Sequence, residues 1–131
     1  MKKVLFAVLV FAALLVAACG GGSSEPAALP DVPAEYAGAT SSVVVDAAAG
    51  AEIYKVNCES CHGPQGHGDG PAGVALDPAP KNLPEIAAQV GDDYLYWRVN
   101  TGKEGTSMVA WKGILTDEQI WQVVAHIRTL K

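Results

Sequence analysis

The clearest hydrophobic pattern in the chain lies near its carboxyl end. In the stretch LTDEQIWQVVAHIRTLK, apolar side chains recur three and four positions apart, at Ile120, Val123, Val124, Ile127 and Leu130. This period predicts an amphipathic helix. Thr116 is followed three residues later by Gln119, a capping-box pattern that predicts where the helix starts.

Three further helices are predicted upstream, separated by segments rich in glycine and proline. The first lies within DAAAGAEIYKVNCESCH, with Asp46 as its N-cap, and HGPQG ends it. The second begins with Pro84 as its first residue and stops by Gly91. The third covers about residues 92–100, with acids at its start. No segment shows sustained strand alternation, so the expected fold is all-α, with three or four helices.

The amino-terminal segment has the layout of a secretory signal. Lys2 and Lys3 precede an unbroken apolar run from Val4 to Ala18, which is shorter than the roughly 20 residues of a membrane-spanning helix. LVAACGGGSS resembles the lipobox of a bacterial lipoprotein, which implies cleavage before Cys19 and lipidation of its thiol. We therefore expect a signal peptide over residues 1–18; an uncleaved anchor or an ordinary signal are the alternatives.

Composition separates a linker from a domain. Residues 19–45 are rich in Gly, Ser, Pro and Ala without a helical or strand period, so we expect a lipid-anchored flexible linker spanning roughly 30 Å. The alternative is that SSVVVDAA packs on the domain, which we place at residues 46–131. Without Lys2 and Lys3, 7 basic residues face 14 acidic ones, and no basic run exists. We therefore expect no nucleic-acid binding. The acidic charge balance is compatible with a partner protein that presents a basic docking patch.

The predicted domain is small for its loop content. It has 86 residues, of which more than twenty lie in loops rich in glycine and proline. Domains of this kind rarely become stable through apolar burial alone. We therefore expect a bound group at its centre.

Cys58, Cys61 and His62 form the motif CESCH. Two thiols at this spacing near a helix end can add to the two vinyl groups of one haem, and the adjacent histidine then faces the iron; this is the c-type haem attachment pattern. Three alternatives remain. A zinc site usually needs two such pairs, a thioredoxin-like dithiol expects a βαβ unit, and the cysteines could form a structural disulfide.

Met108 is the only methionine besides Met1 and lies in the loop GTSMVAW, before the last predicted helix. It is not on an apolar helical face, where methionine usually fills the core. If a haem is bound through His62, the thioether can reach the opposite face of the iron. Packing within the loop is the alternative.

The arrangement resembles the class I monohaem cytochromes c, the small bacterial domains related to cytochromes c6 and to c-type subunits of terminal oxidases. The matching stretches are CESCHGPQGHGDGP, DYLYWRVNTG, GTSMVAW and LTDEQIWQVVAHIRTL. The resemblance implies one covalent haem c, with Cys58 and Cys61 in the thioethers and His62 and Met108 as axial ligands. In many relatives a proline follows the methionine, whereas Val109 does here.

The resemblance also suggests roles for residues around the haem. Pro71 is a candidate to offer its carbonyl to the His62 ring N–H, which would fix the imidazole. Trp97 and Trp111 are candidates for the haem wall. Arg98 is a candidate partner for a haem propionate; a solvated position on its helix is the alternative.

Other residues are expected to play structural or surface roles. Gly50 and Tyr54 on the first helix should meet Trp121 and its neighbours on the last helix. His67 is expected at the surface, with iron ligation in a Met108 variant as the alternative, and His126 is expected to be solvated.

Iron with histidine and methionine on its two faces has no open site, so it suits electron transfer rather than catalysis. We expect an extracytoplasmic, lipid-anchored carrier, and not an enzyme, at the outer face of the cytoplasmic membrane or the periplasmic side. Its partners would be a quinol-oxidising complex and a terminal oxidase or reaction centre. One alternative is a fixed monohaem subunit of a respiratory membrane complex. The other is a haem sensor or peroxidase-like enzyme, if Met108 does not ligate.

Overall fold

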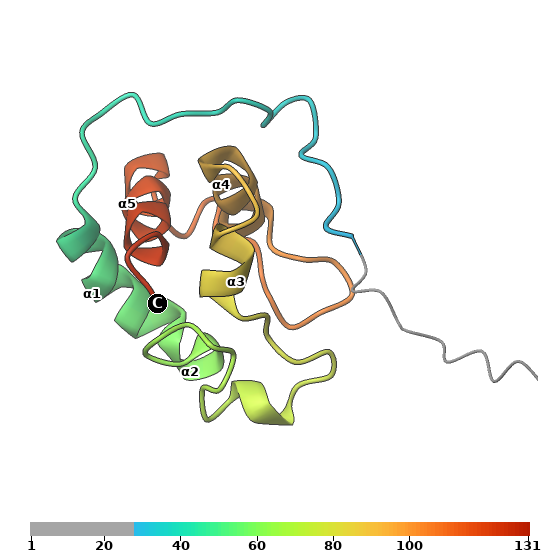
Figure 1. The fold of residues 1–131 in the computed structure, drawn as a ribbon. Coiled ribbons are helices and arrows are strands. Elements are labelled where there is room, and N and C mark those ends of the chain that lie inside the picture. Colours follow the sequence, from blue (N-terminus) through green and yellow to red (C-terminus); the bar gives the residue numbers. More distant parts are fainter. Residues whose placement is uncertain (1–27) are drawn as a thin grey trace, which may run out of the picture.

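The computed structural model describes residues 28–131, in which helices joined by long loops are the regular elements (Figure 1). Its elements are α1 (Ala47–Asn57), α2 (Glu59–His62), the 3₁₀ turn η1 (Gly73–Ala75), α3 (Leu83–Ala87), α4 (Asp92–Thr101) and α5 (Asp117–Ile127). Within these residues the only β pairing is an isolated bridge between Lys112 and Leu115. The predicted all-α fold is confirmed. No helix in this part of the chain combines the length and apolar character needed to cross a membrane.

The predicted starts of the first and last helices are confirmed, whereas α3 begins at Leu83 rather than Pro84 and ends at Ala87. Asp46 caps α1, where its side chain accepts the N–H of Ala48 at 2.8 Å. The capping box of α5 is complete, because Thr116 and Gln119 each donate a backbone N–H to the side chain of the other. The first predicted helix is divided in two, since Cys58 has a non-helical backbone between α1 and α2.

α1 and α5 form the main helix crossing of the domain (Figure 1). Gly50 makes this approach possible, because a Cβ at this position would lie 1.9 Å from the carbonyl oxygen of Gln122. Tyr54 is buried in the same crossing, and its ring centroid lies 5.0 Å from that of His126. His126 was expected to be solvated; instead it is half-buried, and burial lowers its pKa.

The predicted crossing is confirmed, but its residue partners differ from the expected ones. Gly50 and Tyr54 face Gln122 and His126, whereas Trp121 lies on the α4 side of α5 and stacks on Tyr96 at 4.3 Å. The helical period predicts which residues of α5 are buried, but it does not predict which of them face α1 and which face α4.

Replacing Gly50 with alanine should weaken the domain, because the added Cβ forces the backbones of α1 and α5 apart. We expect the free energy of unfolding to fall by about 1–3 kcal/mol, the usual range for overpacking. Chemical denaturation of the holoprotein measures this. Ala48→Ser, at an exposed position of α1, serves as control and should change it by less than about 0.5 kcal/mol.

Arg128 joins α3, α4 and the end of α5. Its Nε forms an ion pair with Asp92 at 2.7 Å, and its two terminal nitrogens donate to the carbonyls of Ala87 and Val90, the latter at 2.8 Å. Ala87 is the last residue of α3, Val90 lies in the turn after it, and Asp92 is the first residue of α4. The side chain thus satisfies backbone acceptors that the short helix leaves free.

Arg128→Ala should lower the free energy of unfolding by about 1–2 kcal/mol, because it removes a charged donor from two carbonyls, while solvent weakens the exposed ion pair. Arg128→Lys keeps the charge but loses the planar fork, so it should recover less than half of that loss. Equal stability of the alanine and native proteins in denaturant melts would contradict this role.

The linker expected over residues 19–45 is only partly described. Residues 28–45 run around the outside of the helices before they join α1 (Figure 1), and part of this stretch packs on the domain, so its role as a flexible linker stays a prediction. The segment brings apolar side chains to the core, namely Leu29, Val32, Ala39 and Val45. Residues 19–27, with Cys19, and the predicted signal peptide at 1–18 lie outside the described residues.

Candidate functional site

The CESCH motif lies at the junction of α1 and α2. Cys58 separates the two helices, and Cys61 and His62 belong to α2. Both thiols are free and half-buried. The three-residue spacing and the short helix therefore keep two unbonded thiols next to the imidazole, as haem attachment requires.

Two of the alternatives for the cysteine pair find no support in the described part of the chain. Between residues 28 and 131, no three His, Cys, Asp or Glu side chains are grouped to hold a metal ion. Burial, and then the neighbouring Cys61, raise the pKa of the Cys58 thiol to about 12. Redox-active thiols in CxxC motifs have lowered pKa values, so this environment does not suit a thioredoxin-like dithiol.

The glycine-rich loop after His62 closes over α2 by main-chain hydrogen bonds. Gly68 and Gly70 donate to the carbonyls of His62 and Cys61, at 2.8 and 3.2 Å, and Ala72 donates to Ser60 at 2.9 Å. A Cβ on Gly70 would lie 2.4 Å from the Ser60 carbonyl oxygen. Glycine is therefore needed because the loop backbone touches the helix backbone, which holds the cysteines and the histidine in place.

The His62 ring is prepared for a ligand. Its Nδ1 atom is buried and has no hydrogen-bond partner. Burial lowers the pKa of the ring, and the Lys81 backbone acts in the opposite direction. A buried, neutral imidazole with an unpartnered nitrogen is a typical metal ligand before the metal is bound.

Among the described residues no hydrogen bond joins Pro71 to His62, and the expected contact of the Pro71 carbonyl with the ring stays a prediction. Pro71 lies at the surface, and the backbone of Lys81 is the part of the chain that acts on the ring. Sequence reasoning missed Lys81 because a main-chain acceptor can come from any residue type. The only signal was the position of Lys81 in PAPKNL. This stretch leads back to the glycine-rich loop, where the N–H of Leu83 donates to the carbonyl of Gly66 at 2.7 Å.

Met108 lies in a tight loop between α4 and α5. Its carbonyl accepts the N–H of Lys103 at 3.0 Å, and its own N–H donates to the Thr106 side chain at 3.2 Å. Gly102 starts the loop with a φ of 69°, and a Cβ on it would lie 2.5 Å from the Met108 carbonyl. Within residues 28–131 no hydrogen bond or ion pair joins this loop to the CESCH motif, so ligation by Met108 stays a prediction.

Arg98 lies over aromatic rings of its own helix. Its guanidinium carbon is 3.8 Å from the centroid of the Trp97 ring, and its Nε donates to the Tyr94 hydroxyl at 3.4 Å. In the described residues, the one ion pair involves Arg128, so Arg98 has no carboxylate partner there. It is half-buried rather than freely solvated. The Arg98 guanidinium is therefore fixed in position and, among the described residues, has no carboxylate partner, so it could bind a carboxylate such as a haem propionate.

The remaining site candidates have different surroundings. Trp97 contacts Tyr94 edge to face, with 5.5 Å between the ring centroids. Trp111 packs against the core, and its backbone N–H donates to the carbonyl of Val99. Their place in a haem wall stays a prediction. His67 is exposed, and its Nε2 lies 2.9 Å from the backbone oxygen of Lys131. The ring thus contacts the carboxyl end of the chain.

These residues fit a covalently attached haem. Two free thiols stand at the attachment spacing, the buried ring nitrogen of His62 lacks a partner, and Arg98 offers an unpaired cation. When bound, the group would supply an iron centre that changes oxidation state.

Comparison with known proteins agrees with this site. Residues 45–127 match the family described as "Cytochrome C oxidase, cbb3-type, subunit III". Cytochrome c6 of Thermosynechococcus vestitus is 33% identical over 85 residues, which cover 65% of this chain and 70% of that protein. Cytochrome c6 of Synechococcus elongatus is 34% identical over 82 residues, covering 63% and 87%.

Solved structures share the fold. A chain of the Kuenenia stuttgartiensis reducing HAO-like protein complex Kustc0457/Kustc0458 aligns with a TM-score of 0.57 and 26% identity, over 65% of this chain and 44% of that one. The KustC0563 c-type cytochrome aligns with a TM-score of 0.53 and 24% identity, over 66% and 99%. The chain therefore belongs to the cytochrome c family described as cbb3-type oxidase subunit III and is a class I c-type cytochrome, a family that implies a covalently bound haem c.

Proposed function

We propose that this protein is a membrane-anchored electron carrier with a single haem c, attached through Cys58 and Cys61 and ligated by His62 and Met108. The observation that carries the proposal is the buried, unpartnered Nδ1 of His62, directly beside two free thiols. The chain has one CxxCH motif, which supports a single haem. Membership of the cytochrome c family supports electron transfer as the activity.

Each residue of the site would support the transfer of one electron without binding or converting a substrate. His62 and Met108 would together hold the haem iron, which would leave no place for a substrate to bind. The soft thioether of Met108 favours the reduced state and raises the potential. The glycine loop fixes the CESCH backbone, so little rearrangement accompanies electron transfer. Arg98 would neutralise a propionate on the aromatic surface of α4.

Attachment to the membrane is the second part of the proposal. Lipidation of Cys19 would place several acyl chains at the amino terminus, and two or more anchors hold a protein durably at a bilayer. The protein would then work outside the cytoplasmic membrane. Its partners would be redox proteins: a quinol-oxidising complex as donor, and a terminal oxidase or reaction centre as acceptor. Its net negative charge suits partners with a basic docking surface.

A coulometric redox titration of the purified holoprotein tests the carrier function. We expect one electron per chain in a single wave, with both oxidation states six-coordinate. Carbon monoxide should bind the reduced protein slowly or not at all, because Met108 occupies the sixth position. Rapid binding of carbon monoxide, with a five-coordinate high-spin iron in both states, would instead support the sensor or peroxidase-like alternative.

A fixed subunit of a respiratory complex is the second candidate function. The observation that favours it is the family match, whose description names a subunit of a cbb3-type oxidase. Gentle solubilisation of membranes followed by native separation distinguishes the two. A carrier should migrate at the size of its own chain in detergent, whereas co-migration of haem with a large complex would support the subunit.

A further inference from the structure

Residues 29–39 pack against the domain although they lie outside the family match, which begins at residue 45. We call residues 29–39 the docked segment. In Figure 1 it runs in blue to teal along the outside of α4. Leu29, Val32 and Ala39 pack against the core cluster that includes residues of α4 and α5. A sequence rich in alanine, proline and glycine therefore has a defined place on the domain.

The docked segment satisfies a buried polar group. Asn100 is 2% exposed, and among the described residues it is the one buried polar or charged side chain. Its Oδ1 accepts the hydroxyl of Tyr36 at 3.2 Å, and its Nδ2 donates to the Tyr96 hydroxyl at 3.2 Å. Without the segment this oxygen would lose that partner, and a buried acceptor without a partner is strongly unfavourable.

A second hydrogen bond fixes the other end of the segment to the start of α4. The N–H of Gly38 donates to Oδ2 of Asp93 at 2.8 Å, while Oδ1 of the same carboxylate accepts the N–H of Tyr94 at 2.9 Å. Gly38 has a φ of 72°, a conformation that glycine adopts readily. The turn at Gly38 therefore directs the Gly38 N–H to the Asp93 carboxylate, which also accepts a backbone N–H at the start of α4.

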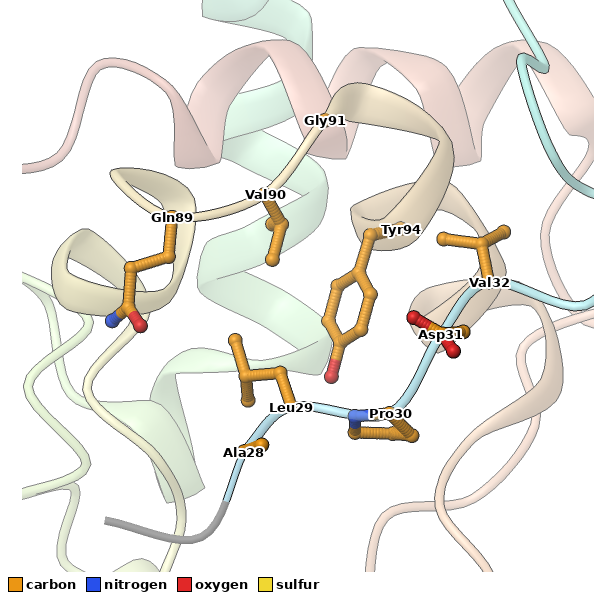
Figure 2. Close-up of a pocket in the computed structure, with 9 residues that line it drawn as sticks. All are labelled: Ala28, Leu29, Pro30, Asp31, Val32, Gln89, Val90, Gly91 and Tyr94. Carbon is orange, nitrogen blue, oxygen red and sulfur yellow. The ribbon is translucent and has the colours of Figure 1, made fainter. Parts of the chain in front are cut away.

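Apolar contacts complete the docking near residue 30. Figure 2 shows Leu29 and Val32 on one wall of a pocket of about 440 Å³, with Val90 and Tyr94 on the other. The Leu29 side chain points between Val90 and the Tyr94 ring, whose hydroxyl faces the segment. Tyr94 is buried at this place, although it lies at the edge of the core.

We propose that the docked segment is a built-in part of this protein that limits how far the domain reaches from the membrane. The inference rests on the proposed lipid at Cys19. Leu29 is ten positions after Cys19, so these two residues lie at most about 35 Å apart. A free chain up to Asp46 would allow about 95 Å. The described chain reaches the domain beside the start of α4, so the proposed tether would join it there.

Hydrogen exchange of the full-length holoprotein, followed by mass spectrometry, tests the docking. Peptides covering residues 29–39 should exchange at least about tenfold more slowly than an unstructured chain. Val32→Ala removes a packed side chain and should accelerate this exchange several-fold. Val44→Ala is the matched control, because Val44 is 99% exposed, and it should leave the exchange unchanged. Exchange at the rate of an unstructured chain, or equal effects of the two variants, would overturn the docking.

Neutron reflectometry on a supported bilayer tests the limited reach. The native protein layer should stay within about 35 Å plus the width of one domain, and Tyr36→Ala combined with Val32→Ala should thicken it. Equal thickness of both layers would overturn the limit. If the protein is absent from membranes altogether, the proposed anchor fails with it, whereas protection of residues 29–39 would still support the docking.

Discussion

Replacing both Cys58 and Cys61 with alanine should leave the domain largely unfolded, without a cooperative unfolding transition at 25 °C. The physical reason is that only the folded chain would pack around the attached haem and ligate its iron, so loss of the haem removes the stabilisation that these contacts provide. The core among residues 28–131 is formed mainly by α4 and α5, and Tyr54 of α1 is also buried, while α2 and its glycine loop are held largely by main-chain hydrogen bonds. Far-ultraviolet circular dichroism during urea titration measures the result.

Val56→Ala is the matched control for this experiment. Val56 lies two residues before Cys58 and is 81% exposed, so its replacement should leave haem attachment and stability unchanged. A double cysteine variant that unfolds with the native midpoint would show that the helices are stable without a bound group. The expectation that a small, loop-rich domain needs such a group would then be wrong.

Replacing Met108 with leucine should lower the reduction potential by an amount on the order of 100 mV, within the roughly 0.8 V range that axial ligands span. Leucine keeps the size of the side chain but removes the thioether that favours the reduced iron. A redox titration followed by visible spectroscopy measures the shift. Val109→Ala, at an exposed neighbouring position, should leave the potential nearly unchanged.

The same variant decides whether His67 acts as a replacement ligand. Its ring contacts the backbone oxygen of Lys131, so ligation would require it to leave that position. We therefore expect Met108→Leu and Met108→Leu combined with His67→Ala to have the same spectrum. A low-spin bis-histidine spectrum that disappears only in the double variant would contradict this.

Local features of the fold were predicted well because they depend on neighbouring residues. The capping box at Thr116 and Gln119, the N-cap at Asp46 and the helical period of α5 all involve side chains within one or two turns. The break at Cys58 was missed, because no glycine or proline marks it. At this break the CESCH motif is hydrogen-bonded to α1 on one side and to the glycine-rich loop on the other.

Long-range contacts were beyond the sequence pattern. Tyr36 and Asn100 are 64 positions apart, and composition alone favoured a free linker around Tyr36. A weak signal existed, since Leu29, Val32 and Tyr36 recur at three and four positions within an otherwise small-residue segment. The Lys81 backbone gave no signal beyond its place in PAPKNL, because a carbonyl near His62 depends on the path of the loop and not on a side chain.

The candidate site was predictable to the extent that covalent chemistry requires adjacent residues. The spacing in CESCH placed Cys58, Cys61 and His62 together, and the structure agrees. Arg98 with Tyr94 follows helical spacing and could have been predicted from it. Among the described residues no hydrogen bond or ion pair joins the Met108 loop to the CESCH motif, so neither periodicity nor spacing determines where Met108 lies relative to His62.

The visible spectrum of the purified protein, oxidised and then reduced, tests the central claim most directly. His62 and Met108 as the two iron ligands predict a low-spin spectrum in both states and, in the oxidised protein, the weak charge-transfer band at the red end that a thioether ligand produces. Treatment with acid and organic solvent should leave the haem on the chain, because Cys58 and Cys61 hold it covalently. Extraction of the haem by that treatment, or a high-spin iron without the red band, would contradict the proposed site.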